Sequence, residues 1–261
     1  MINPFRLARR TAGKIIRAVP WLRRQRYASC DHALIRKEDA ASLRQQGWGS
    51  PLTAWRQEKA YMALLAEMRA GVPRIDLAVA ARAVDSLGLG EASLLEVGCG
   101  SGYYSEVFPA LSRTHIAYTG IDYSSAMIAR AQKRYPGTDF RVADATSMPF
   151  QDGSFDIVFN GVSLMHIPEF EKAIAESARV ARRACIFHSV PVLNRLGNSY
   201  LRKYAYGALV VEIIFNRGSL ISLFAASGLR VAQSWPTIDY NVGHVLGEES
   251  CAETFLCLPE R

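Results

Sequence analysis

The sequence lacks any run of apolar residues long enough to cross a membrane as a helix. Nothing in its 261 residues approaches the roughly eighteen consecutive apolar positions that a membrane span requires. Cysteine is also scarce, and the five residues are scattered, odd in number and without the spacing of zinc ligands: Cys30, Cys99, Cys185, Cys251 and Cys257. We therefore expect no disulfide framework and no metal site, and a reducing, cytoplasmic setting.

Acidic residues are absent from positions 1–26, which contain eight arginine and lysine residues. These positive charges exceed the net charge of +7 of the whole chain, so the remainder of the protein is close to neutral. A nucleic-acid-binding enzyme more often carries its positive charge near the active site. No nucleic acid is therefore expected as a partner.

The basic segment is also amphipathic. At about 100° per residue one helix face carries Phe5, Ala8, Ala12, Ile15, Ile16 and Val19. The opposite face carries Arg6, Arg9, Arg10, Lys14 and Arg17, and Pro20 ends the pattern. Such a helix is typical of segments that lie on an anionic membrane surface, so we expect a peripheral membrane association. An organellar transit segment and a solvated basic tail are the two alternatives.

A glycine-rich turn follows the apolar residues 94–97. Gly98, Gly100 and Gly102 alternate with other residues and a helix-compatible segment follows them, which predicts a strand, a tight turn and a helix. Glycine lets the backbone of such a turn approach a ligand closely. A dinucleotide-binding turn needs its third glycine three residues after the second, but this position is Tyr103. A nicotinamide-dependent oxidoreductase is therefore the less favoured alternative.

The run from Glu96 to Gly102, an acid followed by three alternating glycines, resembles the first motif of the class I S-adenosylmethionine-dependent methyltransferases. Two later segments are similar to that family in the same order. A strand-like segment ends at Asp122, whose carboxylate can accept hydrogen bonds from both hydroxyls of a ribose. Asp144 and Ala145 then precede an expected fourth strand, as the family's adenine-contacting acid does. Together these motifs cover about residues 90–190.

The resemblance implies an α/β fold with a Rossmann-like, doubly wound and mostly parallel seven-stranded sheet. It divides the chain into a basic arm (1–30), a helical extension (31–90) and a methyltransferase domain (91–261). Helices are expected at 39–46, 52–70, 75–87, 125–135, 169–181 and 219–227. Residues 191–215 mix aromatic and charged side chains, and we interpret them as a lid over the acceptor, with an amphipathic helix as the alternative.

The family resemblance also implies S-adenosyl-L-methionine as the cofactor. Its methionine portion would lie against Glu96 and the glycine turn, its ribose at Asp122, and its adenine at Asp144. The implied cofactor residues are Glu96, Gly98, Cys99, Gly100, Gly102, Asp122, Tyr123, Met127, Asp144, Ala145, Asn160 and Tyr61. Met127 equally fits plain helix packing.

The region before the first strand of this fold commonly covers the cofactor. Tyr61 and Arg56 are therefore candidates to bind its carboxylate, and packing of Tyr61 and Trp55 against the sheet edge is the alternative. A protein that only binds would be expected to have lost Gly98 or Asp122, and both are present.

The methyl acceptor is less clearly specified. Related families that methylate nucleobase amino groups follow an Asn or Asp with two prolines and an aromatic residue, whereas Asn160 is followed by Gly161. A hydroxyl acceptor benefits from a general base, and His166 lies near the end of the same strand, although it also suits a plain bond to backbone. We expect methylation at oxygen of a small-molecule, glycan or lipid-linked acceptor. An RNA methyltransferase, supported only by the basic pI and arm, is the alternative.

Overall fold

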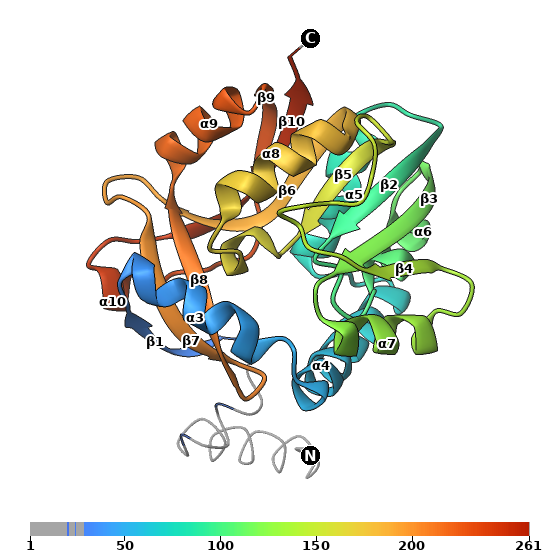
Figure 1. Cartoon of the computed structure of the whole chain (residues 1–261). Helices are drawn as coiled ribbons and strands as arrows, with labels where there is room; N and C mark the ends of the chain where they lie inside the picture. Colours follow the sequence, from blue (N-terminus) through green and yellow to red (C-terminus); the bar gives the residue numbers. More distant parts are fainter. Residues whose placement is uncertain (1–19, 21–23, 25–28, 261) are drawn as a thin grey trace, which may run out of the picture.

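The structure is a computed structural model, and it describes Pro20, Arg24 and residues 29–260 (Figure 1). The amphipathic helix predicted for positions 5–19 lies outside the described residues. The described part is built around one mixed sheet of ten strands. None of its helices combines the length and apolar character needed to cross a bilayer.

Seven strands form the core of this sheet, in the order β4-β3-β2-β5-β6-β10-β9. The bounds are β2 Glu91–Val97, β3 His115–Asp122, β4 Asp139–Val142, β5 Phe155–Gly161, β6 Ala181–Leu193, β9 Leu229–Pro236 and β10 Cys251–Pro259. The first five strands in this order pair in parallel, whereas β10 runs antiparallel to both β6 and β9. The predicted doubly wound, Rossmann-like sheet is confirmed.

Helices cover both faces of the sheet, which explains why its central strands are apolar on both sides. On one face Leu94 and Phe159 pack with α5 (Ile75–Asp85) and α6 (Tyr104–Leu111). On the other face the neighbouring residues Leu95 and Val158 pack with α8 (Phe170–Val180) and α9 (Arg217–Ala226).

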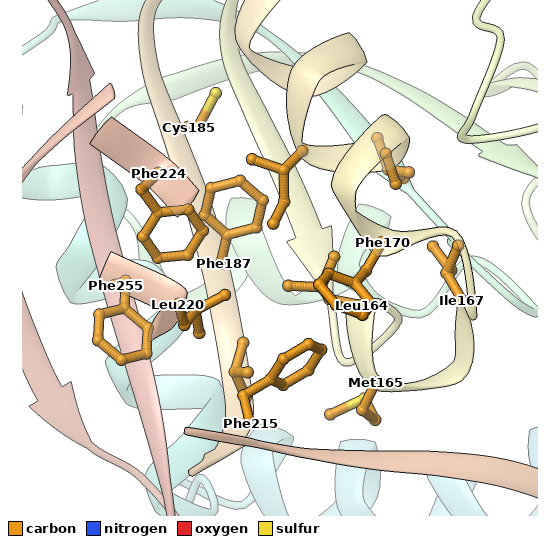
Figure 2. Close-up of a cluster of buried hydrophobic side chains, with 14 of the residues drawn as sticks. Leu164, Met165, Ile167, Phe170, Cys185, Phe187, Phe215, Leu220, Phe224 and Phe255 are labelled. Atoms are coloured by element: carbon orange, nitrogen blue, oxygen red, sulfur yellow. The ribbon is translucent and has the colours of Figure 1, made fainter. Parts of the chain in front are cut away.

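Aromatic rings fill the second of these layers. Figure 2 shows Phe187 of β6 between the strands and α9, where its ring stacks on Phe224 with centroids 4.5 Å apart. Phe170 at the start of α8 meets Phe215 edge to face at 5.0 Å. This packing fixes the position of the segment that follows β6.

Three further strands extend the sheet beyond the predicted seven: β1 Cys30–Leu34, β7 Ser199–Ala205 and β8 Ala208–Asn216. They pair antiparallel in the order β1-β7-β8, and β8 joins the end of β6 through two parallel residue pairs. The helical alternative for residues 191–215 is therefore wrong. Tyr206 and Gly207 both have positive φ, as a two-residue hairpin turn requires. The nearly continuous run of branched and aromatic apolar residues in β8 favours a buried strand.

The segment before the core contains the predicted helices, α3 (Lys37–Gly47), α4 (Pro51–Arg69) and α5. Pro51 starts α4 in the first helical turn, where its missing N–H has no helical partner to lose. The strand β1 was not predicted within this segment. Figure 1 shows α3 lying across β7 and β8, and α4 beside α7 (Ser125–Arg134). Among residues 29–260, two further short helices are η1 (Leu164–His166) and α10 (Gly243–Leu246).

Candidate functional site

A cavity of about 450 Å³ lies where β2, β3 and β5 end, at the carboxyl edge of the parallel sheet. Its lining includes Gly98 after β2, Asp122 at the end of β3, and Gly161 at the end of β5. The opposite walls come from α4 and from the β7–β8 hairpin. Ligands of open α/β sheets bind at this edge, and the volume falls in the range of small-molecule sites.

The glycine turn forms the floor of the cavity. Gly98, Gly100 and Gly102 have φ values of 73°, 54° and 81°, which residues with a Cβ rarely adopt. A Cβ on Gly98 would collide with Ser163, and one on Gly100 would come within 2.8 Å of Gln57. A Cβ on Gly102 would instead meet the Phe140 ring, away from the cavity lining. Gly98 and Gly100 thus face the cavity, and Gly102 allows the turn to pack on the sheet.

Asp122 is held at the cavity wall by backbone amides. Its Oδ2 accepts from the Gly100 N–H at 2.9 Å and its Oδ1 from the Ser124 N–H at 2.8 Å. Burial raises the pKa of the carboxyl to about 6, although these two hydrogen bonds act in the opposite direction. Each carboxylate oxygen keeps a further lone pair that can accept from a ligand hydroxyl.

Glu96 lies beneath the cavity floor and is fully buried. One carboxyl oxygen accepts a hydrogen bond from the Tyr118 hydroxyl, and the other, Oε1, has no partner among the described residues. A Cβ on Gly161, which lines the cavity, would collide with this Oε1, so the glycine is what leaves room for the oxygen at this position. Burial raises the pKa of Glu96 well above its usual range, with Asp122 adding to the effect.

The other predicted cofactor residues divide into two groups. Cys99, Tyr123, Met127 and Ala145 line the cavity. Asp144 and Asn160 lie outside its lining. Asp144 Oδ1 accepts from the backbone and hydroxyl of Thr146, both at 2.8 Å, which folds the loop after β4.

Asn160 is buried and donates to the Ser177 hydroxyl on α8 at 3.2 Å. The amide therefore ties β5 to a covering helix and does not face the cavity.

The N-terminal helices supply one wall. Tyr61 of α4 lines the cavity and stacks on Tyr103, with ring centroids 3.8 Å apart and an interplanar angle of 13°. Arg56 does not line it and instead donates to the Tyr206 carbonyl at 3.2 Å. Arg74, which the sequence did not single out, does line the cavity, where its Nε donates to Asp76 at 2.6 Å.

Gln57 was also missed. It lines the cavity, and its side-chain oxygen accepts from the Ser101 N–H at 3.3 Å, which docks α4 onto the glycine turn. Its place between the two predicted candidates Arg56 and Tyr61 was the available signal, but sequence alone did not indicate which side chain of that helix faces the turn.

His166 lies on the cavity wall in η1. Its Nδ1 is 2.6 Å from the Val211 carbonyl of β8, and because a carbonyl can only accept, Nδ1 carries the hydrogen. Burial, with a contribution from Lys203, lowers the pKa of His166 to about 4, so the ring is neutral near pH 7. Nε2 therefore keeps a lone pair, and it has no hydrogen-bond partner among the described residues. The Trp48 ring lies 5.1 Å from this imidazole.

Comparison with known proteins points to the part of the chain that contains the glycine turn and Asp122. Residues 95–188 match the family described as "Methyltransferase domain". A phthiotriol/phenolphthiotriol dimycocerosates methyltransferase of Mycobacterium tuberculosis is 41% identical over 105 residues, which cover 39% of this chain and 38% of that protein. A probable S-adenosylmethionine-dependent methyltransferase of Mycolicibacterium smegmatis is 33% identical over 94 residues, 36% of this chain and 35% of the other. The chain thus aligns with little more than a third of these relatives.

The similarity of fold extends further than the similarity of sequence. The crystal structure of Burkholderia thailandensis 1,6-didemethyltoxoflavin-N1-methyltransferase, with bound 1,6-didemethyltoxoflavin and S-adenosylhomocysteine, matches with a TM-score of 0.55 at 14% identity. The match covers 89% of this chain and 94% of that one. At this identity it shows the fold alone.

Sheet order, glycine turn and family match together define the class of protein. Residues 95–188 are a methyltransferase domain of the class I, S-adenosylmethionine-dependent type, whose methyl donor is S-adenosyl-L-methionine.

Proposed function

We propose that the protein transfers the methyl group of S-adenosyl-L-methionine to an oxygen atom of a small-molecule, glycan or lipid-linked acceptor. The observation that carries this proposal is a single cavity with the Gly98–Gly100 backbone and Asp122 on one side and His166 on another. A donor site and a candidate proton acceptor thus share one enclosed space, as methyl transfer to a hydroxyl requires.

The residues present fit the cofactor. Asp122 would accept from the ribose hydroxyls, and Tyr123 and Met127 would flank the adenine. The unpartnered Glu96 Oε1 offers an acceptor to the cofactor's amino group at Gly161. Arg74, at the far wall, offers its guanidinium to the carboxylate. When bound, S-adenosyl-L-methionine supplies an electrophilic methyl group on a sulfonium.

Asp144 and Asn160 would contribute indirectly, because both lie outside the cavity lining. Asp144 shapes the loop whose next residue, Ala145, does line it. Asn160 holds the end of β5, where Gly161 forms part of the floor.

His166 would accept the proton of the acceptor hydroxyl at Nε2. The bond from Nδ1–H to Val211 fixes the ring and its tautomer, so Nε2 is presented to the cavity without a proton. A pKa near 4 makes the imidazole a weak base. We therefore infer that the proton moves as the oxygen gains its methyl group and not in an earlier step.

The acceptor is proposed to be largely apolar. Leu64, Ile167, Pro191, Ile238 and Ala252 line the cavity away from the glycine turn. The name of the mycobacterial relative, which refers to phthiotriol dimycocerosates, supports a hydroxylated lipid-linked acceptor. The basic segment 5–19 would hold the enzyme beside such an acceptor on an anionic membrane surface.

Calorimetry and product analysis test the function. Full-length protein should bind S-adenosylhomocysteine and should not bind NAD. Incubation with methyl-labelled cofactor and hydroxylated lipid fractions should yield label in an alkali-stable methyl ether, identified by mass spectrometry. Binding of NAD in place of S-adenosylhomocysteine would overturn the proposal, and an N-methylated product would overturn the assignment to oxygen.

A further inference from the structure

Besides Asp122 and the glycine turn, the cavity wall contains a cluster of polar side chains from β7, β8 and the segments beside them. We call Ser29, His32, Lys203, Glu212 and Tyr240 the hairpin cluster. Lys203 of β7 donates to Glu212 Oε1 on the neighbouring strand β8, and the Tyr240 hydroxyl donates to Glu212 Oε2. All of the cluster except His32 lines the cavity.

Ser29 and His32 complete the cluster from the side of β1. The Ser29 hydroxyl lies 2.8 Å from His32 Nε2 and 3.1 Å from the Tyr240 hydroxyl. His32 Nε2 in turn lies 3.1 Å from the same Tyr240 hydroxyl. These contacts fix the orientation of Tyr240, and through it that of the Glu212 carboxylate.

The ion pair at the centre of this cluster is almost completely buried. The side chains of Lys203 and Glu212 are 6% and 2% exposed. Burial opposes ionisation of Glu212, but the Lys203 charge and the hydrogen bonds around it lower the pKa of the carboxyl well below its usual range. Packed apolar residues would stabilise a fold at least as well as such a pair. Its place in a cavity wall therefore indicates a role in binding.

The remaining hydrogen-bonding capacity of this pair specifies the chemistry of a ligand. A lysine ammonium has three N–H donors, and Lys203 uses one of them for Glu212. The two Glu212 oxygens offer about four lone pairs, and Lys203, Tyr240 and His32, whose Nε2 lies 3.5 Å from Oε2, occupy at most three of them. A single hydroxyl can accept from Lys203 and donate to Glu212 at once. A carboxylate would be attracted by Lys203 but repelled by Glu212, and an ammonium the reverse, so neither charged group gains a net electrostatic advantage at this pair.

The cluster also adjoins the proposed base. His166 donates to the carbonyl of Val211, the residue before Glu212 on β8. None of the five cluster residues falls within residues 95–188, which match the methyltransferase family. The cluster therefore lies outside the segment that carries the family's cofactor motifs.

We propose that Lys203 and Glu212 form an acceptor subsite that binds a second hydroxyl group of the acceptor. The acceptor is then an apolar molecule with two hydroxyls a few bonds apart, one held by this pair and one methylated beside His166. This inference rests on the proposed methyltransferase function and names its substrate class.

Matched probes test the subsite by calorimetry on the full-length protein saturated with S-adenosylhomocysteine. The probes are 1-octanol, 1,2-octanediol, 1,3-octanediol, octanoate and octylamine. At least one diol should bind roughly tenfold more tightly than 1-octanol, since its second hydroxyl gains bonds to charged partners. Octanoate and octylamine should bind no better than 1-octanol. Equal affinities for 1-octanol and both diols would overturn the subsite.

A double variant separates the subsite from general packing. K203M with E212L removes both charges together, so neither is left buried and unpaired. It should bind 1-octanol at least as well as the wild type and lose the preference for a diol. R202M is the matched control, because Arg202 lies on the same strand and is exposed. The subsite is refuted if the double variant keeps the tenfold preference.

The same measurements distinguish this inference from the proposed function. If S-adenosylhomocysteine binds and the diol preference is absent, the subsite is wrong and the methyltransferase assignment stands. If S-adenosylhomocysteine does not bind, the assignment fails, and the diol series on the unliganded protein then tests the subsite alone.

Discussion

The two proposed halves of the cavity, one for the methyl donor and one for the acceptor, are built in different ways. The donor half is built mainly from backbone: the positive-φ turn at Gly98 and Gly100, and the amides that hold Asp122. The acceptor half is built from side chains on distant segments, such as Lys203, Glu212 and Tyr240. A backbone site suits a ligand that a whole family shares, whereas side-chain sites can change without altering the fold. The donor half should therefore be general and the acceptor half specific.

Replacing His166 with Ala should have the largest effect of the changes proposed here. It should lower the rate of methyl transfer without weakening cofactor binding. Loss of a general base typically lowers the rate by about 10²–10⁴-fold, while cofactor affinity should stay nearly constant because His166 lies on the acceptor side. Single-turnover methyl transfer and calorimetry measure the two quantities. His115→Ala, at an exposed histidine, is the control. Turnover within a few-fold of wild type would leave His166 a purely structural role.

Removal of residues 1–28 tests whether membrane binding depends on the N-terminal segment and is independent of both halves of the cavity. Each basic side chain near an anionic bilayer contributes about 1 kcal/mol, so the segment 5–19 should dominate membrane binding. Co-sedimentation with anionic liposomes should be lost on truncation and weakened by salt, while S-adenosylhomocysteine still binds.

The matched control for the truncation is a full-length protein with five charges replaced by glutamine, at Arg6, Arg9, Arg10, Lys14 and Arg17. If full-length wild type stays in the supernatant at low salt, the membrane role is refuted.

Replacing Asp122 with Ala tests the donor half directly. Hydrogen bonds to a charged group contribute about 1.5–3 kcal/mol each, so the affinity for S-adenosylhomocysteine should fall at least roughly tenfold. Binding of the octanediols should be unaffected if the halves are independent. Asp152→Ala, in an exposed turn, is the control. Unchanged cofactor affinity in a folded Asp122→Ala protein would remove Asp122 from the site.

The smallest expected effect is a pH dependence confined to the donor half. Because burial raises the pKa of Asp122 to about 6, its carboxylate gains a proton as the pH falls through that value. S-adenosylhomocysteine affinity should weaken by up to about tenfold between pH 7 and pH 5, and less in Asp122→Asn.

Folding stability should respond in the opposite direction. The folded pKa lies above the unfolded one, so the contribution of Asp122 to stability is fully present below the unfolded pKa and is lost as the pH rises toward 6. Calorimetry measures the affinity for S-adenosylhomocysteine between pH 7 and pH 5, and thermal unfolding measures the stability as the pH rises toward 6. A flat affinity profile would contradict the raised pKa.

The contrast between a half built from backbone and a half built from distant side chains also explains which residues the sequence could predict. Gly98, Gly100 and Asp122 were found because a positive-φ turn and a strand-ending acid leave local patterns. Arg74 and Gln57 were missed because they reach the cavity only through the way in which α4 and α5 dock on the sheet. Asn160 was assigned to the cofactor site from its position at a strand end, but its side chain faces α8.

The acceptor half was harder to predict because it depends on strand register. The mixture of aromatic and charged side chains in residues 191–215 led to their interpretation as an acceptor lid, which stays a prediction. The Lys203–Glu212 pair exists only because a Tyr206–Gly207 turn sets the two strands beside each other. β1 was missed because its five residues form a strand only by pairing with β7, far along the chain.

The contact between Gln57 and Ser101 has a consequence for how such enzymes are divided into modules. Family motifs mark a unit that begins at residue 95, yet Trp48, Gln57 and Tyr61 wall in the same cavity from the segment before it. A boundary drawn by motif would cut through the binding chamber. Exchange of the motif-bearing unit between relatives would therefore transfer the glycine turn and Asp122. It would leave behind Trp48, Gln57 and Tyr61, which close the same cavity.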